Sequence, residues 1–126
     1  MALLLIDREG WRREWLYCLS RFADLRAQQD RWLDSAESNP HYTFAEMMCS
    51  YCDDLMLGEL DYRLALEAGC VTPGEVAIVS NFHALVVNYR SPAGDYDYDA
   101  IVRDPAWHQV GEEAQRVLAT LSFGGD

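Results

Sequence analysis

Apolar side chains recur along this chain at steps of three and four residues, the spacing that lines up one face of an α-helix. The first such series predicts a helix over about 11–33 with a solvated opposite face. Its inward positions are Trp11, Trp15, Leu19, Phe22, Leu25 or Arg26, Gln29 and Trp32. The sequence Ser-Asn-Pro at 38–40 ends this section, because a residue before proline is pushed out of the helical conformation.

A second helix is predicted to begin at Thr43. Thr43 and Glu46 form a capping box, in which the threonine oxygen accepts from one amide and the glutamate reaches back to another. One apolar stripe follows at helical spacing: Phe44, Met47, Met48, Tyr51, Cys52, Leu55 and Met56. We expect Gly58 to stop this helix, and a short third helix over 59–68 to be closed by Gly69.

A proline signal opens the fourth predicted helix. Thr72, Pro73 and Glu75 supply a cap, a proline in the first turn and a glutamate, which predicts a helix through about Tyr89. This segment has a wide apolar face, formed by Val76, Ile78, Val79, Phe82, Leu85, Val86 and Tyr89. We therefore expect it to be the most buried helix.

The last helix is predicted to open in the same way at Asp104 and Pro105, after a helical turn near 100–103. Its inner side is formed by Trp107, Val110, Ala114, Val117, Leu118 and Leu121. These signals agree on an all-α bundle of about five helices. A length of 126 residues, 50% of them hydrophobic, fits one domain over 1–126 with an ordered core over about 11–121.

The charge of the chain is acidic and unevenly distributed. Its net charge is −11, and all ten basic residues are arginine. Residues 1–45 hold six arginines against seven acids, whereas residues 46–126 hold four arginines against 14 acids. Such a surface repels nucleic-acid phosphates and anionic membranes, and it attracts a basic protein by long-range steering. The sequence therefore predicts a protein partner, and neither a nucleic-acid nor a membrane partner.

The N-terminal apolar run, residues 2–6, is too short for export or anchoring. No other run approaches the roughly 18 apolar residues of a membrane span. We therefore expect a cytoplasmic protein. Its four cysteines, Cys18, Cys49, Cys52 and Cys70, are then expected to be reduced thiols in the core.

The pair Cys49 and Cys52 is the first candidate for chemistry. One Cys-x-x-Cys pair supplies two of the four ligands that a structural zinc site needs, and no second pair is present. The histidines His41, His83 and His108 form no catalytic or metal-binding spacing. The sequence thus predicts a protein without cofactor or metal that is not an enzyme. A metal-dependent or thiol enzyme that uses Cys49 and Cys52 ranks third, behind the two binding functions given below.

Two acidic segments are candidates for binding. The segment 52–61 carries Asp53, Asp54, Glu59 and Asp61, but it lacks the alternating oxygen ligands of a calcium-binding loop. It is either a solvated helix face or an acidic contact surface.

The segment 94–100 carries Asp95, Tyr96, Asp97, Tyr98 and Asp99. Tyrosine is enriched at interface hot spots, and aspartate beside it steers and pairs with basic side chains. The segment suits capture of a basic protein surface. The alternative is that Tyr96 or Tyr98 covers the end of the bundle while the aspartates are solvated.

Three stretches, "FAEMMCSYCDDLML", "GEVAIVSNFHALVVNY" and "YDAIVRDPAWHQVGEEAQRVLATL", resemble small acidic all-helical bacterial immunity proteins. These are inhibitors made beside contact-dependent or secreted toxins. The resemblance covers about 43–121 and rests on architecture, charge and the Asp-Pro-x-Trp helix start. It implies a cognate basic toxin domain as partner and no catalytic residues.

The leading hypothesis is therefore an inhibitor of the immunity or antitoxin type, which occludes a basic site on a toxin. The predicted contact residues are Asp53, Asp54, Glu59, Asp61, Asp95, Tyr96, Asp97, Tyr98 and Asp99. The alternative is a small regulatory or scaffold module that binds an endogenous protein or forms a homodimer through an exposed aromatic patch.

Overall fold

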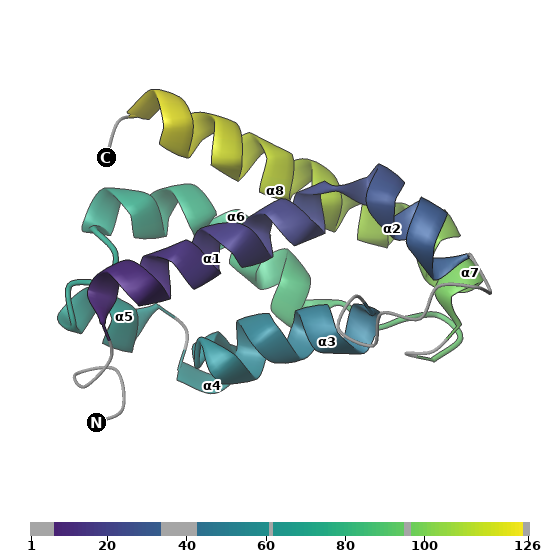
Figure 1. Ribbon diagram of the computed structural model, residues 1–126, viewed down its shortest axis with the longest axis horizontal. Coiled ribbons are helices and arrows are strands. Elements are labelled where there is room, and N and C mark those ends of the chain that lie inside the picture. Colours follow the sequence, from purple (N-terminus) through teal and green to yellow (C-terminus); the bar gives the residue numbers. More distant parts are fainter. Residues whose placement is uncertain (1–6, 34–42, 61, 95–96, 125–126) are drawn as a thin grey trace.

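A computed structural model gives an all-α fold, as predicted (Figure 1). The structure describes residues 7–33, 43–60, 62–94 and 97–124, and these contain no strand. The elements are α1 (Arg8–Ala23), α2 (Leu25–Trp32), α3 (Phe44–Cys49), a π-helical turn η2 (Ser50–Asp54), α4 (Leu57–Leu60), α5 (Arg63–Glu67), α6 (Pro73–Asn88), α7 (Tyr98–Arg103) and α8 (Pro105–Gly124). The predicted count of about five helices is too low. The helix predicted over 11–33 is divided into α1 and α2, and the two helices predicted from Thr43 to Gly58 and over 59–68 correspond to α3, η2, α4 and α5.

The first predicted helix is interrupted at Asp24. Its backbone leaves the helical region, with φ −89° and ψ 71°, and its carboxylate accepts a hydrogen bond from the amide of Ala27 to cap α2. Because of this break, the buried face of α2 lies one residue earlier in the sequence than the pattern predicts. Gln28 is fully buried, whereas Gln29 and Arg26 are exposed, which corrects the predicted inner face.

The second predicted helix begins as expected but ends earlier. Thr43 Oγ1 accepts from the amide of Glu46 at 3.1 Å. The chain then widens into the π-helical turn, and Met56 adopts a left-handed conformation with φ 61°. Gly58 lies inside α4 instead of stopping a helix. A Cβ at this position would lie 3.0 Å from Cys52 Cβ, so the glycine permits a close approach of two turns.

The later helix signals are confirmed. Thr72 Oγ1 accepts from the amide of Glu75 at 3.2 Å, and Glu75 Oε1 accepts from the amide of Thr72 at 2.9 Å. Both halves of the capping box at the start of α6 are therefore formed. Gly69 follows α5 with φ 79°, and Asp104 accepts from the amide of Ala106 at the start of α8.

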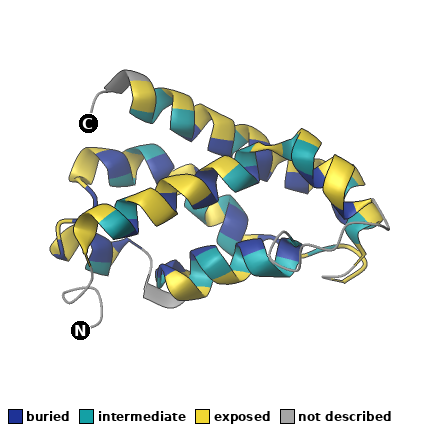
Figure 2. Ribbon diagram, viewed as in Figure 1, coloured by how far each residue is buried: buried dark blue, intermediate teal, exposed yellow. Residues whose placement is uncertain are grey.

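The helices pack around one contiguous core. In Figure 1 α8 runs along the top and α3 with α4 along the bottom, and α1 crosses between them. Figure 2 shows buried residues on the faces that the helices turn toward one another. Trp107 lies at the centre of an aromatic cluster, with ring centroids 5.1 Å from Tyr89, 5.3 Å from Phe44 and 5.7 Å from Phe22.

The tryptophans of α1 and α2 all belong to this core. Trp11, Trp15 and Trp32 are at most 7% exposed. They stabilise the bundle through apolar burial and are not available as a second interface.

Candidate functional site

The structure describes the side chains of five of the nine predicted contact residues: Asp53, Asp54, Asp97, Tyr98 and Asp99. Asp61, Asp95 and Tyr96 lie outside the described residues, as does the side chain of Glu59. The geometry of the candidate site is therefore built from two places, the end of η2 and the start of α7.

Asp53 and Asp54 are neighbouring exposed carboxylates at the end of η2. Within the described residues neither forms a salt bridge. Their charge acts on nearby thiols. The pKa of Cys49 is raised by desolvation and then by the carboxylates of Asp53, Glu46 and Asp54. The pKa of Cys18 rises to about 12, mainly through desolvation, with Asp54 adding a smaller effect. Carboxylates of this segment thus add to the effect of desolvation on both thiols.

The residues at the start of α7 have structural roles as well as charge. Asp97 caps α7 through a backbone amide 3.1 Å away, and Asp99 pairs with Arg103 at 2.9 Å. The half-buried Tyr98 lies with its ring centroid 5.6 Å from that of Trp32. Tyr98 therefore covers the bundle end, as the alternative interpretation expected, while the carboxylates of Asp97 and Asp99 stay exposed.

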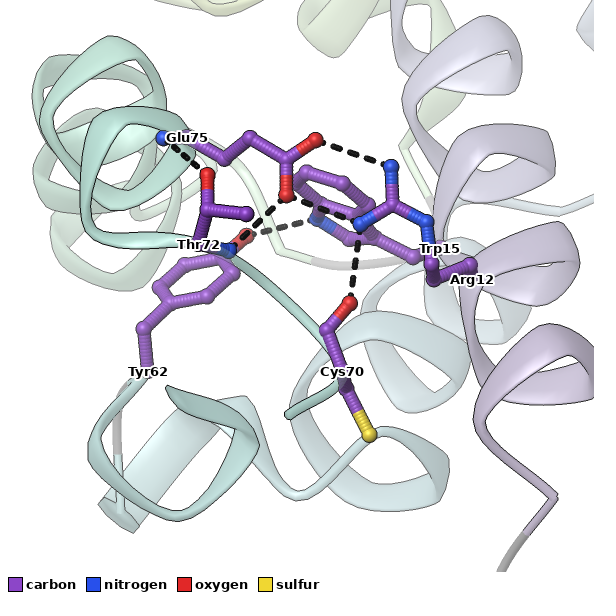
Figure 3. A network of polar contacts seen from close by, with 6 residues as sticks. All are labelled: Arg12, Trp15, Tyr62, Cys70, Thr72 and Glu75. Atoms are coloured by element: carbon purple, nitrogen blue, oxygen red, sulfur yellow. Dashed lines mark hydrogen bonds and ion pairs between the residues drawn. The ribbon is translucent and has the colours of Figure 1, made fainter. Parts of the chain in front are cut away.

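A chain of aromatic hydrogen bonds, which the sequence pattern did not reveal, crosses the core. Trp15 Nε1 donates to Tyr62 Oη at 2.8 Å, as Figure 3 shows. Tyr62 Oη lies 2.9 Å from Tyr51 Oη, which lies 2.7 Å from Nδ1 of the half-buried His83.

The indole of Trp15 can only donate, so Tyr62 Oη accepts the first bond of this series. Either hydroxyl can donate in the bond between Tyr62 and Tyr51, and the role of His83 Nδ1 follows from the tautomer of the ring. Burial raises the pKa of Tyr51 and that of Tyr62, so both phenols stay protonated at neutral pH. These hydrogen bonds order the core. Because both phenols are buried and protonated, neither is an ionised nucleophile.

The cysteines are free thiols of differing burial. Cys18 and Cys70 are buried, Cys52 is half-buried and Cys49 is exposed, which corrects its predicted place in the core. Desolvation leads the causes that raise the pKa of Cys49 and of Cys52, whereas a nucleophilic cysteine needs a lowered pKa. The described part of the chain holds no cluster of three side chains suited to a metal ion.

Among the described residues, no helix is both long and apolar enough to span a bilayer. The arrangement offers exposed carboxylates on a rigid aromatic core, and the chemistry that these groups support is the binding of cationic groups. The chain matches no protein-family model, no curated protein and no solved structure.

Proposed function

We propose that this protein is an inhibitor of the immunity or antitoxin type, which binds a cognate basic toxin domain through its acidic surface. The observation that carries the proposal is the pair Asp53 and Asp54, exposed side by side with no arginine paired to them in the described part of the chain. A partner's arginine or lysine would supply the missing counter-charge.

Three of the four arginines of residues 46–126 are engaged with other groups. Arg103 pairs with Asp99, Arg116 pairs with Glu113 at 2.6 Å, and Arg90 donates to a backbone carbonyl at 2.8 Å. The remaining excess of carboxylates generates a field that accelerates encounter with a basic domain. No turnover is part of this function, which is proposed to operate in the cytoplasm.

The resemblance over about 43–121 supports the same proposal, because it combines an acidic chain, an all-helical fold and the Asp-Pro-x-Trp helix start. An inhibitor of this kind needs a rigid surface that is complete before the toxin arrives, and the aromatic core described above supplies such a support.

A second candidate function is a regulatory module that binds an endogenous protein or a second copy of itself. It is favoured by Leu16 and Tyr17, adjacent exposed residues on α1, with 36% and 54% of their surface accessible. Sedimentation of the purified protein distinguishes self-association from a monomer. The inhibitor is supported if the protein sediments as a monomer and if its deletion harms cells only when the neighbouring gene is expressed.

The proposal is tested by co-expression with the protein encoded immediately upstream. We expect rescue of a toxic product, co-purification of the two proteins, and association that slows as salt rises. The double variant Asp53→Asn/Asp54→Asn should weaken rescue, whereas the exposed control Glu112→Gln on α8 should not. Absence of toxicity and of a complex would contradict the inhibitor hypothesis.

A further inference from the structure

The hydrogen bonds that link Trp15 to His83 contain a limited number of hydrogens. Trp15 Nε1, Tyr62 Oη and Tyr51 Oη carry one hydrogen each, and three contacts join these groups to one another and to His83 Nδ1. Tyr51 is fully buried and Tyr62 is 4% exposed, and these contacts are the hydrogen bonds that their hydroxyls form in the described part of the chain. Three hydrogens are thus available for three contacts before His83 supplies any.

The protonation state of His83 decides whether every hydrogen finds an acceptor. With the ring hydrogen on Nε2, each contact holds one hydrogen, and donation runs from Trp15 through Tyr62 and Tyr51 to Nδ1. With a hydrogen on Nδ1, as in the imidazolium, four hydrogens meet three contacts and one buried donor has no acceptor. A buried donor without an acceptor loses its hydration with no compensating bond. The core therefore favours the neutral ring with its hydrogen on Nε2.

The ring of His83 is accessible to protons from solvent. It is half-buried and borders an open cavity of about 360 Å³ together with Tyr62 and Arg63. The titratable groups that face it in the described part of the chain are Tyr51 from η2, Tyr62 just before α5, and Arg63 from α5. The guanidinium of Arg63 places a positive charge at the same cavity, which also disfavours an imidazolium.

Two thiols lie near the phenol of Tyr51, those of Cys18 on α1 and Cys52 in η2. Desolvation is the largest cause that raises the pKa of each, so both thiols are neutral in mildly acidic and neutral solution. Among the described groups around this series of bonds, the imidazole is therefore the one that changes charge between pH 7 and pH 5.

We propose that His83 is a pH-sensitive contact between α6 and η2. In neutral solution its bare Nδ1 accepts a hydrogen bond from Tyr51. In mildly acidic solution a proton from solvent binds Nδ1, one hydrogen of the series loses its acceptor, and the bond between α6 and η2 breaks. Asp53 and Asp54 lie at the end of the same turn, so acid loosens the support of these carboxylates. The inference depends on the hydrogen bonds of the core and not on the proposed function.

The first test determines which ring nitrogen carries the hydrogen. Long-range ¹H–¹⁵N NMR of the full chain labelled with ¹⁵N-histidine detects both nitrogens of each ring, and the variant His83→Gln identifies the signals of His83. At pH 7.5 we expect the chemical shift of a non-protonated nitrogen at Nδ1 and of a protonated nitrogen at Nε2. A protonated Nδ1 at this pH would overturn the proposal.

The second test follows the titration of the same signals. Tyr51→Phe removes the hydroxyl that donates to Nδ1, so the midpoint of the His83 titration should rise by roughly 0.5–1 pH unit. Tyr17→Phe removes a hydroxyl from an exposed tyrosine and should leave the midpoint unchanged. The same midpoint in Tyr51→Phe and the wild type would contradict a bond that favours the neutral ring.

The third test measures the loosening of η2 by hydrogen exchange. The amide of Leu55 donates to the carbonyl of Ser50 at 3.1 Å across this turn. Its protection, corrected for the intrinsic pH dependence of exchange, should fall about tenfold from pH 7 to pH 5 in the wild type. His83→Gln keeps an acceptor for Tyr51 but does not titrate, so its protection should change by less than about twofold. An equal fall in both proteins would refute the role of His83.

Discussion

The guanidinium of Arg12 binds both carboxylate oxygens of Glu75, with Nη1 to Oε1 and Nη2 to Oε2 each at 2.8 Å (Figure 3). Arg12 Nη1 also donates to the carbonyl of Cys70 at 2.8 Å. Glu75 is 4% exposed and completes the capping box of α6. One bidentate pair thereby joins α1 to the start of α6. Removal of the Arg12 side chain leaves the buried carboxylate of Glu75 without its counter-charge.

Arg12→Ala is therefore expected to lower the free energy of unfolding by roughly 1.5–3 kcal/mol, the range for hydrogen bonds to charged groups. Urea denaturation at neutral pH measures the change. Arg13→Ala, at the exposed neighbouring position, should stay within about 0.5 kcal/mol of the wild type. Equal losses in the two variants would show that Glu75 does not depend on Arg12.

The same pair predicts a pH dependence. Hydrogen bonding from Arg12 is the largest cause that lowers the pKa of Glu75, so its carboxylate is more acidic in the folded than in the unfolded chain. The contribution of Glu75 to the free energy of unfolding is therefore fully present above the pKa that this group has in the unfolded chain. It is lost as the pH falls through the pKa that the group has in the folded chain. The free-energy difference between wild type and Glu75→Gln should shrink from pH 7 to pH 3. A constant difference would contradict the linkage.

Breaking the aromatic chain should destabilise the core. Tyr62→Phe removes the acceptor of the buried Trp15 indole, and Tyr51→Phe removes the hydroxyl that bonds to both Tyr62 and His83. Each is expected to cost about 1–3 kcal/mol. The double variant should cost less than the sum, because the hydroxyls belong to one network. Tyr17→Phe, at an exposed position, is the control, and strict additivity would argue against a connected chain.

Gly111 in α8 lets Leu25 pack closely. A Cβ at this position would overlap the side chain of Leu25. Gly111→Ala should therefore destabilise the fold by about 1–3 kcal/mol, although alanine is the better helix former. Thermal unfolding measures the effect. Gly74→Ala, where the nearest side-chain atom is 3.9 Å from the added Cβ, should be neutral or stabilising. A neutral Gly111→Ala would mean that Leu25 moves freely.

The field of the acidic site can be measured through Cys49. Desolvation and then the carboxylates of Asp53, Glu46 and Asp54 raise the pKa of this exposed thiol. Asp53→Asn/Asp54→Asn should lower that pKa and speed iodoacetamide labelling of Cys49 at pH 8, followed by peptide mass spectrometry. The double variant Glu67→Gln/Glu112→Gln, which also removes two exposed carboxylates, is the charge-matched control. An unchanged labelling rate would mean that the two carboxylates exert no field at this site.

The helix starts were predictable because their bonds are local. Thr72 and Glu75 are three residues apart, and Asp104 caps an amide two residues away, so the sequence contains both partners of each bond. The helical stripes were predictable for the same reason, since apolar spacing fixes a buried face. The break at Asp24 was not, because the apolar pattern continues through it. Gln28 bonds across this break, donating to the carbonyls of Arg21 and Phe22 and accepting from the indole of Trp107, 79 residues away.

The sequence by itself determined the helical class, the caps and the excess of carboxylates over arginines. Only the tertiary structure decided which polar groups meet. Arg12 and Glu75 are 63 residues apart, and Trp15 and Tyr62 are 47 residues apart. It also decided that Tyr98 covers Trp32 while Asp53 and Asp54 stay exposed. Periodicity encodes which face of a helix is buried, but contacts between distant residues depend on how the buried faces pack together.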